Sequence, residues 1–387
     1  MAVSSPPMAE DALVSPEQPM KSIAARSVAA DPPPTADVGS KIRKGVLRLA
    51  VIVAIVALAV ILLPGLDHVR HDLGRLSAQW LALAIGLEVL SSLSYILLFH
   101  RSFCLGVPWR ISSRIGASEL GVDSLIPAGG ASGLALGAWV LKRRGMQPER
   151  LPGLSVAFFL LTSLVNLAAV IVFGLGLWFG VFPGRAPIGL TLVPAAIAAI
   201  AILFFLLLPR LMRPGSERRV LHGRPRRLLR RLLDVAPQGV VETVALLRRG
   251  DPLIYIGSVG YWAFDTAVLL VCFQALGHTP PVAVVGCAYL IGQLGGVLPL
   301  PLGIGGVDGG LIASFVLFGV DASVATAAVL AYRVVQIWVP AIIGGAALLR
   351  LRKTFDPRVL ASEAVTRVSG AEHPSPPNRA TPSANAP

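Results

Sequence analysis

The sequence predicts an all-α polytopic membrane protein, with about six transmembrane helices and two re-entrant, broken helical hairpins in an inverted repeat. Three observations lead to this fold class. First, 54% of the 387 residues are hydrophobic and 14% are charged, with a mean hydropathy of +0.72, which is too apolar for an ordinary soluble domain. Second, long apolar runs recur along the chain, each able to cross a hydrocarbon core of about 30 Å. Third, two further apolar runs are interrupted by proline and glycine.

The predicted spans are six uninterrupted apolar runs: Val46–Leu66, Trp80–Phe99, Leu154–Phe179, Pro187–Leu208, Leu253–Leu276 and Val324–Leu349. We interpret the first run as a retained helix and not as a cleaved signal, because it follows a long leader and is long enough to span. Residues 1–44 and 351–387 are rich in Pro, Ala and Ser without apolar periodicity, which predicts two disordered tails around a membrane domain at 45–350.

The second interrupted run, at about 283–319, contains the most concentrated helix-breaking signal of the chain. Pro299 and Pro301 remove backbone donors, and Gly303, Gly305 and Gly306 allow a sharp turn. In lipid, backbone freed in this way must be packed in protein or must line a wet cavity. The run is therefore a candidate functional site.

The first interrupted run, at about 115–141, repeats this pattern at a constant offset in residue number. The matched pairs are Leu120 with Leu294, Gly121 with Gly295, Pro127 with Pro301, Gly129 with Gly303, and Gly145 with Gly319. Gly130 completes the first turn. Five matches in one register indicate an internal duplication, and each half of the first run is too short to cross the membrane alone.

The distribution of basic residues predicts the topology of the two runs. Both flanks of the first run are basic: Arg101, Arg110 and Arg114 before it, and Lys142, Arg143, Arg144 and Arg150 after it. By the positive-inside rule, the run enters from the cytoplasm and returns there. The arginine-rich loop at 209–250 and both termini are then also cytoplasmic, and the second run enters from the opposite side. Transporters with such inverted repeats bind their substrates near the membrane midplane, between discontinuous helices.

Ionisable residues inside apolar segments are the candidate binding groups, because each charge there costs about 2.5–3.5 kcal/mol on insertion scales. They are Glu88, Glu119, Asp123, Asp265, Asp308 and Arg333. The separation of Glu88 and Asp265 differs from the repeat offset by one helical turn, so these two acids are expected to share a polar cavity. The alternative is that these groups are paired structural carboxyls or reach the membrane interface.

The hairpin tips predict a second kind of recognition. Half-helices returning from near Ala131 and Gly306 would point free backbone amides into the membrane, where such ends attract anions. Together with Arg333, they could hold a lipid phosphate while the carboxylates meet a cationic headgroup or carry protons. Alternatively, Arg333 pairs with Asp308 and only fixes the hairpin. Gln293 begins the proline- and glycine-rich part of the second run and is included among the candidate substrate-binding residues. Tyr332 and Gln336 are weaker candidates because of their helical spacing to Arg333.

Several other function classes are disfavoured. The basic excess, 34 Lys+Arg against 21 Asp+Glu, lies between hydrophobic spans, which favours topology and anionic lipid over nucleic acid. Cys104, Cys272 and Cys287 show no metal-ligand spacing and predict no disulfide. Gly130-Ala-Ser-Gly133 resembles a rhomboid serine motif, but no histidine is expected inside a span to act as base for Ser132. An enzyme is not expected, and neither is a metal or a cofactor.

The two broken motifs resemble the membrane region of lysylphosphatidylglycerol synthases and their stand-alone, flippase-like relatives. The resemblance is carried by Leu125-Ile-Pro-Ala-Gly-Gly, by the Leu298 to Gly310 run and by Ala331-Tyr-Arg333, and it spans about 45–350. The family motif usually ends in Glu where this chain has Asp308. The resemblance implies lipid movement between leaflets, with Asp308 and Arg333 as leading candidates. It also implies no aminoacyl-transfer activity, because only a short tail follows the last span.

Together these observations predict a lipid flippase or lipid transporter of the plasma membrane. Its expected partners are anionic, aminoacylated or polyprenyl-linked lipids, with no nucleic acid, and either a second copy of the chain or an envelope-biosynthesis protein. The alternative from a different class is a membrane subunit that supports an envelope-lipid or glycan enzyme without transporting. An intramembrane hydrolase acting through Ser132 is a third hypothesis.

Overall fold

The computed structural model describes residues 47, 77–104, 107–125, 137–138, 140–142, 147, 149–184, 187–211, 224–294 and 306–354. Within these ranges every regular element is a helix, and five helices are long and apolar enough to cross a membrane. They are α4 (Ala78–Phe103), α7 (Leu151–Trp178), α8 (Ile188–Leu211), α10 (Pro252–Ala275) and α13 (Ala322–Thr354). Five of the six predicted spans are thereby confirmed, with ends shifted by a few residues. The other, Val46–Leu66, lies outside the described residues except for Leu47.

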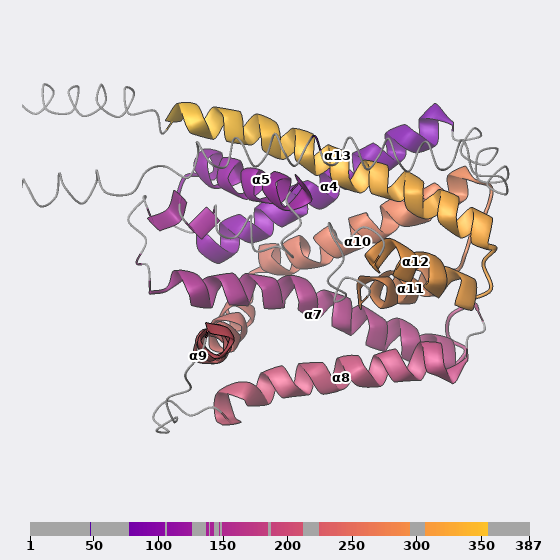
Figure 1. Cartoon of the computed structure of the whole chain (residues 1–387), viewed down its shortest axis with the longest axis horizontal. Coiled ribbons are helices and arrows are strands. Elements are labelled where there is room, and N and C mark those ends of the chain that lie inside the picture. The colour runs from indigo at the N-terminus through magenta and orange to yellow at the C-terminus, as the bar shows by residue number, and fades with distance from the viewer. Residues whose placement is uncertain are drawn as a thin grey trace, which may run out of the picture. The chain divides into compact units, whose positions relative to one another are not determined.

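Helices α4 and α10 form the centre of the bundle and run antiparallel (Figure 1). Near one end, a Cβ on Gly257 would stand about 3.0 Å from Leu98, so the two backbones touch there. Further along, the Ser91 hydroxyl donates to the Tyr261 carbonyl. Near the other end, Ala84 of α4 belongs to the same buried cluster as Val268 and Cys272 of α10. Close contact through small residues is how helices gain packing energy where lipid offers no hydrophobic drive.

Each interrupted run begins with a helix that does not span. In the second run, α11 (Val282–Leu294) and α12 (Gly306–Leu317) pack directly on each other, because a Cβ on Gly310 would stand 2.9 Å from the Gly292 carbonyl oxygen. In the first run, α5 (Trp109–Leu125) is met by Gly137, whose Cβ would stand 2.5 Å from Glu119 Oε2. The midpoints of these two contacts fall at positions 128 and 301. Their separation agrees with the sequence offset to within one position, as expected of two equivalent hairpins.

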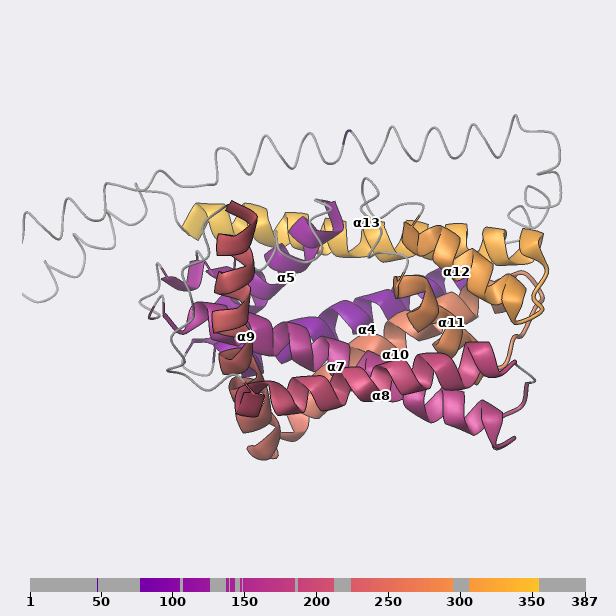
Figure 2. The same cartoon turned by 60° about the horizontal axis from the view of Figure 1, so that its bottom comes forward.

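The two hairpins lie at opposite ends of the bundle in both views (Figure 2). Each packs on the last helix of the other repeat. Helix α5 contacts α13 through Gly121 and Gly344, where a Cβ on Gly344 would stand 2.4 Å from the Gly121 Cα. In the corresponding place of the second repeat, α11 contacts α7 through Gly286 and Phe173. This exchange of packing partners is the architecture of an inverted repeat.

The predicted start of the first interrupted run, at about 115, needs correction. Helix α5 begins at Trp109, so Arg110 and Arg114 belong to its first turns and not to a flank before the run. Long arginine side chains can extend from a helix end to the aqueous interface, which makes a basic first turn compatible with a membrane segment. The arginine-rich connection at 209–250 contains the 25-residue helix α9 (Arg224–Arg248), which packs on α7 and α8.

Some predictions fall where the structure gives no description. Both tails are of this kind, and so is Ser132. The same holds for seven of the eight predicted hairpin-tip residues: Pro127, Gly129, Gly130, Pro299, Pro301, Gly303 and Gly305. The eighth, Gly306, is the first residue of α12, as expected.

Candidate functional site

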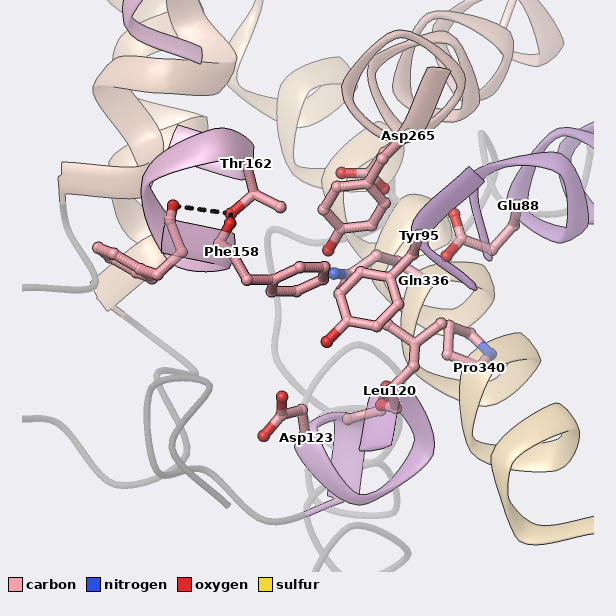
Figure 3. Close-up of a pocket in the computed structure, with 12 residues that line it drawn as sticks. Glu88, Tyr95, Leu120, Asp123, Phe158, Thr162, Asp265, Gln336 and Pro340 are labelled. Atoms are coloured by element: carbon pink, nitrogen blue, oxygen red, sulfur yellow. Dashed lines mark hydrogen bonds between the residues drawn. The ribbon is translucent and has the colours of Figure 1, made fainter. Parts of the chain in front are cut away.

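A cavity of about 270 Å³ lies among the helices of the two repeats. Its lining comes from five helices, α4, α5, α7, α10 and α13, and Figure 3 shows these side chains. The polar side chains that line it are Glu88, Tyr95, Asp123, Ser124, Thr162, Tyr261, Asp265 and Gln336. Three of them are carboxylates, and none of the described lining residues is basic. The cavity therefore offers acceptors and negative charge to whatever enters it.

The cavity is placed near the middle of the spanning helices. Glu88 is the eleventh of 26 residues in α4, and Asp265 is the fourteenth of 24 in α10. At 1.5 Å per residue each carboxyl is about 15 Å or more from the nearer helix end, which corresponds to the centre of a bilayer. The predicted sharing of one polar cavity by these two acids agrees with the structure.

Asp265 is held by two tyrosine hydroxyl groups. The Tyr332 hydroxyl donates to this carboxylate and lies 3.0 Å from Asp265 Oδ2 and 3.1 Å from Oδ1. The Tyr289 hydroxyl also donates to Oδ2. All three side chains are buried. Because a buried carboxylate costs several kcal/mol unless donors compensate it, these two tyrosines are what allow Asp265 to sit inside the bundle.

Glu88 has a different environment. It is only 4% exposed, faces Asp265 within hydrogen-bonding reach, and lines the same cavity. Its second oxygen, Oε2, is buried without a hydrogen-bond partner among the described residues. A buried acceptor without a donor is expensive, so this oxygen is aimed at a ligand, a proton or water in the cavity.

Glu119 and Tyr95 form a second tyrosine–carboxyl contact in the first repeat, with the Tyr95 hydroxyl 3.2 Å from Glu119 Oε1. Both this pair and the Asp265–Tyr289 pair join the first helix of a repeat to the first half of its hairpin, and each is 24 residues apart. The order is exchanged, since the carboxyl is on the hairpin in one repeat and on the long helix in the other. Glu119 is fully buried and does not line the cavity.

Asp308 and Arg333 pair with each other, as one of the two sequence hypotheses proposed. Arg333 Nε contacts Asp308 Oδ1, and Arg333 Nη1 donates to Gln336 Oε1 at 3.0 Å. Neither Asp308 nor Arg333 is among the described lining residues of the cavity, although Gln336 is. The ion pair fixes α12 to α13. That Arg333 also holds a lipid phosphate stays a prediction.

Of the two remaining candidates, one lines the cavity and the other contacts a tyrosine of the site. Asp123 lines the cavity from α5, whereas Gln293 contacts Tyr289 near the end of α11. The sequence reading missed Tyr95, Tyr261 and Tyr289, which provide hydroxyl groups of the site. The signal that could have found two of them is the equal sequence spacing between each hairpin acid or tyrosine and its partner on the long helix.

No group of three potential metal ligands is found within the ranges that the structure describes. The three cysteines are buried thiols on different segments. The polar groups of the site are thus carboxylates, hydroxyls and one amide, which suit binding by charge and hydrogen bonding.

These features define a class, a multi-pass membrane protein with an inverted repeat of helical hairpins around an acidic intramembrane cavity. The chain belongs to the family described as lysylphosphatidylglycerol synthase TM region, whose family model matches residues 45–344. The likeness seen in the two broken motifs is thereby confirmed.

Three curated relatives are similar to this chain, and all are described as UPF0104 membrane proteins. One from Methanocaldococcus jannaschii is 37% identical over 100 residues, which covers 26% of this chain and 30% of the relative. One from Methanothermobacter thermautotrophicus is 36% identical over 88 residues, covering 22% and 25%. Another from the same organism is 23% identical over 337 residues, covering 78% of this chain and 94% of the relative. The first two matches span about a quarter to a third of those relatives.

Proposed function

We propose that this protein moves a membrane lipid between leaflets, with the lipid headgroup held in the acidic cavity. The observation that carries the proposal is the cavity itself, in which three carboxyl side chains face a common space near the middle of the spanning helices. Ionisable groups at that depth are expensive and are kept where they contact a substrate or an ion. An inverted repeat around such a site is the arrangement used for alternating access.

The charge of the cavity favours a headgroup that carries an amine. Glu88, Asp123 and Asp265 present acceptors, and the described lining contains no basic side chain. Arg333, which could have bound a phosphate, is paired with Asp308. An ammonium group has three donors and no acceptor, so it complements this lining. Among the lipid classes expected from the sequence, an aminoacylated lipid fits better than a purely anionic one.

A second, apolar groove of about 80 Å³ supports a lipid as the substrate. It lies among α7, α8 and α9, and Phe159 belongs to its wall as well as to the wall of the acidic cavity. The residues around it are mainly leucine, phenylalanine, valine and isoleucine. A lipid with its headgroup in the cavity and an acyl chain along this groove would pass over Phe159. Its polar end would then have polar surroundings and its apolar end apolar ones.

The proposal includes the orientation in the cell. The basic segment that contains α9 and both chain ends would lie on the cytoplasmic side of the plasma membrane, where arginine-rich segments bind anionic lipid.

The test is movement of a fluorescent phosphatidylglycerol carrying a lysyl ester in phosphatidylcholine vesicles that contain the purified protein. We expect faster exchange between leaflets than in protein-free vesicles, and a loss of at least tenfold in Asp265→Asn. Glu149→Gln makes a similar neutralising change at an exposed residue away from the cavity and should behave as wild type. Lipid that moves no faster with wild-type protein than without it would contradict transport and favour the supporting-subunit alternative.

A further inference from the structure

Glu88 and Asp265 place two buried carboxyl groups against each other on the two central helices. Glu88 is 4% exposed and Asp265 is 6% exposed, and each is the other's hydrogen-bonding neighbour. Two ionised carboxylates in contact inside a protein repel each other strongly. Such a pair is therefore stable only with a positive charge, and the smallest positive charge is a proton.

The donors around the pair show which carboxyl holds that proton. Asp265 accepts hydroxyl hydrogens from both Tyr289 and Tyr332, which is the surrounding of an ionised carboxylate. Glu88 Oε2 has no donor among the described residues. The consistent arrangement is a protonated Glu88 that donates to an ionised Asp265. This leaves the pair with a single negative charge.

The other titratable and charged groups near the pair do not replace this proton. They come from all the helices packed around it and are Tyr95, Glu119, Asp123, Tyr261, Tyr289, Asp308, Tyr332 and Arg333. The tyrosines are neutral donors, and the acids add negative charge. Arg333 is the cation in this described set, and Asp308 holds it. Among the described residues no second cation faces the pair, so the proposal takes the second positive charge from outside the protein.

We propose that the Glu88–Asp265 pair exchanges one proton for the ammonium group of the lipid, so that lipid movement is driven by a proton moving in the opposite direction. This rests on the proposed function and names its energy source. On exchange, the O–H bond of Glu88 breaks, its electron pair stays on the carboxylate, and the proton leaves to water in the cavity. The pair then carries two negative charges, and the ammonium restores the total to one. Reprotonation of Glu88 releases the lipid.

This mechanism assigns distinct tasks to the two acids. Asp265 keeps its charge throughout, held by the two tyrosine hydroxyls, and provides a permanent attraction for a cation. Glu88 alternates between the two states, and once its proton has left, both of its carboxylate oxygens, including the otherwise unpartnered Oε2, can accept from the ammonium. Since one cation replaces another, the net charge buried in the membrane centre is the same before and after the exchange, which keeps the cost of exchange low.

The experiment imposes a gradient of one pH unit across vesicles containing the full chain, with the membrane potential held at zero by potassium and valinomycin. The probe is the fluorescent lysyl-ester lipid, and its leaflet distribution is measured at steady state. One-for-one exchange predicts about a tenfold excess in the leaflet facing the acidic side, because each pH unit corresponds to a factor of ten. Protein-free vesicles correct for spontaneous redistribution, and Glu149→Gln should keep the tenfold excess.

The outcomes separate the two levels of the proposal. Wild-type protein that moves the lipid but gives equal leaflets under the gradient overturns proton exchange and leaves transport standing. Wild-type protein that moves no lipid under any gradient overturns the proposed function itself. For Glu88→Gln we expect loss of the gradient-driven excess, and a retained tenfold excess would overturn the assignment to Glu88.

A second measurement makes the result independent of how well that variant folds. A pH-sensitive dye inside wild-type vesicles should report one proton exported for each lipid delivered to the inner leaflet, and no proton movement would again overturn the exchange.

Discussion

The two hairpins have the same scaffold but differ in the polar contacts that hold them. In the second hairpin, Asp308 pairs with Arg333, which fixes α12 to α13. At the offset that relates the two repeats, the corresponding positions of the first repeat hold Leu134 and Phe159, which cannot form an ion pair. Phe159 instead lines the acidic cavity. The cavity lies beside the hairpin without this ion pair, so the duplicated fold provides the frame, and the departures from symmetry provide the site.

The largest expected effect comes from breaking the ion pair of the second hairpin. Arg333→Ala leaves Asp308 as a largely buried charge, with 15% of its side chain exposed, and loss of one partner of such a pair costs about 3 kcal/mol or more. Thermal unfolding of the purified protein in detergent should show a markedly lower midpoint. Asp308→Glu keeps the charge and should lower the unfolding midpoint much less. A midpoint for Arg333→Ala equal to that of wild type would show that the pair does not hold the hairpin.

The next effect tests the packing of the first hairpin. In Gly344→Ala the added Cβ would stand 2.4 Å from the Gly121 Cα and 2.5 Å from the Ala117 carbonyl oxygen, so α5 and α13 must separate. Overpacking of this kind costs about 1–3 kcal/mol. The adjacent Gly345→Ala has nothing within 4 Å of its new Cβ and serves as the matched control. Equal stability of the two variants would contradict the close approach.

Smaller effects distinguish the two tyrosine–carboxyl contacts. Tyr95→Phe removes the hydroxyl that contacts Glu119, whose other oxygen already lacks a partner among the described residues, so we expect a loss of about 1–3 kcal/mol. Tyr332→Phe leaves Asp265 with the Tyr289 hydroxyl and should cost less. The comparison of unfolding midpoints at neutral pH decides the order, and a larger loss in Tyr332→Phe would reverse our view of which carboxyl has spare donors.

The smallest effect concerns the start of the second repeat. Asp251 caps α10 through the Leu253 amide and accepts from Arg101 Nε at 2.6 Å. Burial acts to raise the Asp251 pKa, but these hydrogen bonds and the charge of Arg101 outweigh it and hold the pKa below the ordinary value of 3.8. The ionised Asp251 carboxylate therefore stabilises the folded protein above about pH 4. This stabilisation is lost as the pH falls through the lower pKa that Asp251 has in the folded state.

In Asp251→Ala we expect a loss of about 1 kcal/mol at pH 7, typical of a missing helix cap. The difference from wild type should shrink as the pH of the unfolding experiments falls below the ordinary carboxyl pKa of 3.8. A difference that stays constant over this range would exclude the ionised carboxylate as its cause.

Much of the fold could be predicted from the sequence because membrane insertion leaves a strong and local signal. Runs of apolar residues define α4, α7, α8, α10 and α13, and proline and glycine mark the hairpins. The register of the duplication also placed Glu88 and Asp265 on one cavity. What the sequence left open was the partner of each polar group. Whether Arg333 meets a ligand or Asp308 depends on the packing of α12 against α13, which no local pattern encodes.

The tyrosines were missed for a related reason. Tyr95, Tyr261 and Tyr289 are compatible with an apolar helix, so their hydroxyl groups do not stand out from the composition around them. Their role appears only when packing brings their hydroxyl groups to a carboxyl or to the cavity wall. The first run was also predicted to begin too late, at about 115, because Arg110 and Arg114 were assigned to its basic flank, although a helix end can carry arginines to the interface.

The most direct test of the account is the sidedness of the two hairpins, measured with single cysteines in a chain whose three native cysteines are replaced. Trp109→Cys and Glu149→Cys flank the first hairpin, and His278→Cys and Ala322→Cys flank the second; all four positions are exposed. A membrane-impermeant thiol reagent added from one side should label the first two together and the last two only from the other side. Labelling of Trp109→Cys and Glu149→Cys from different sides would contradict the inverted repeat and the cavity built on it.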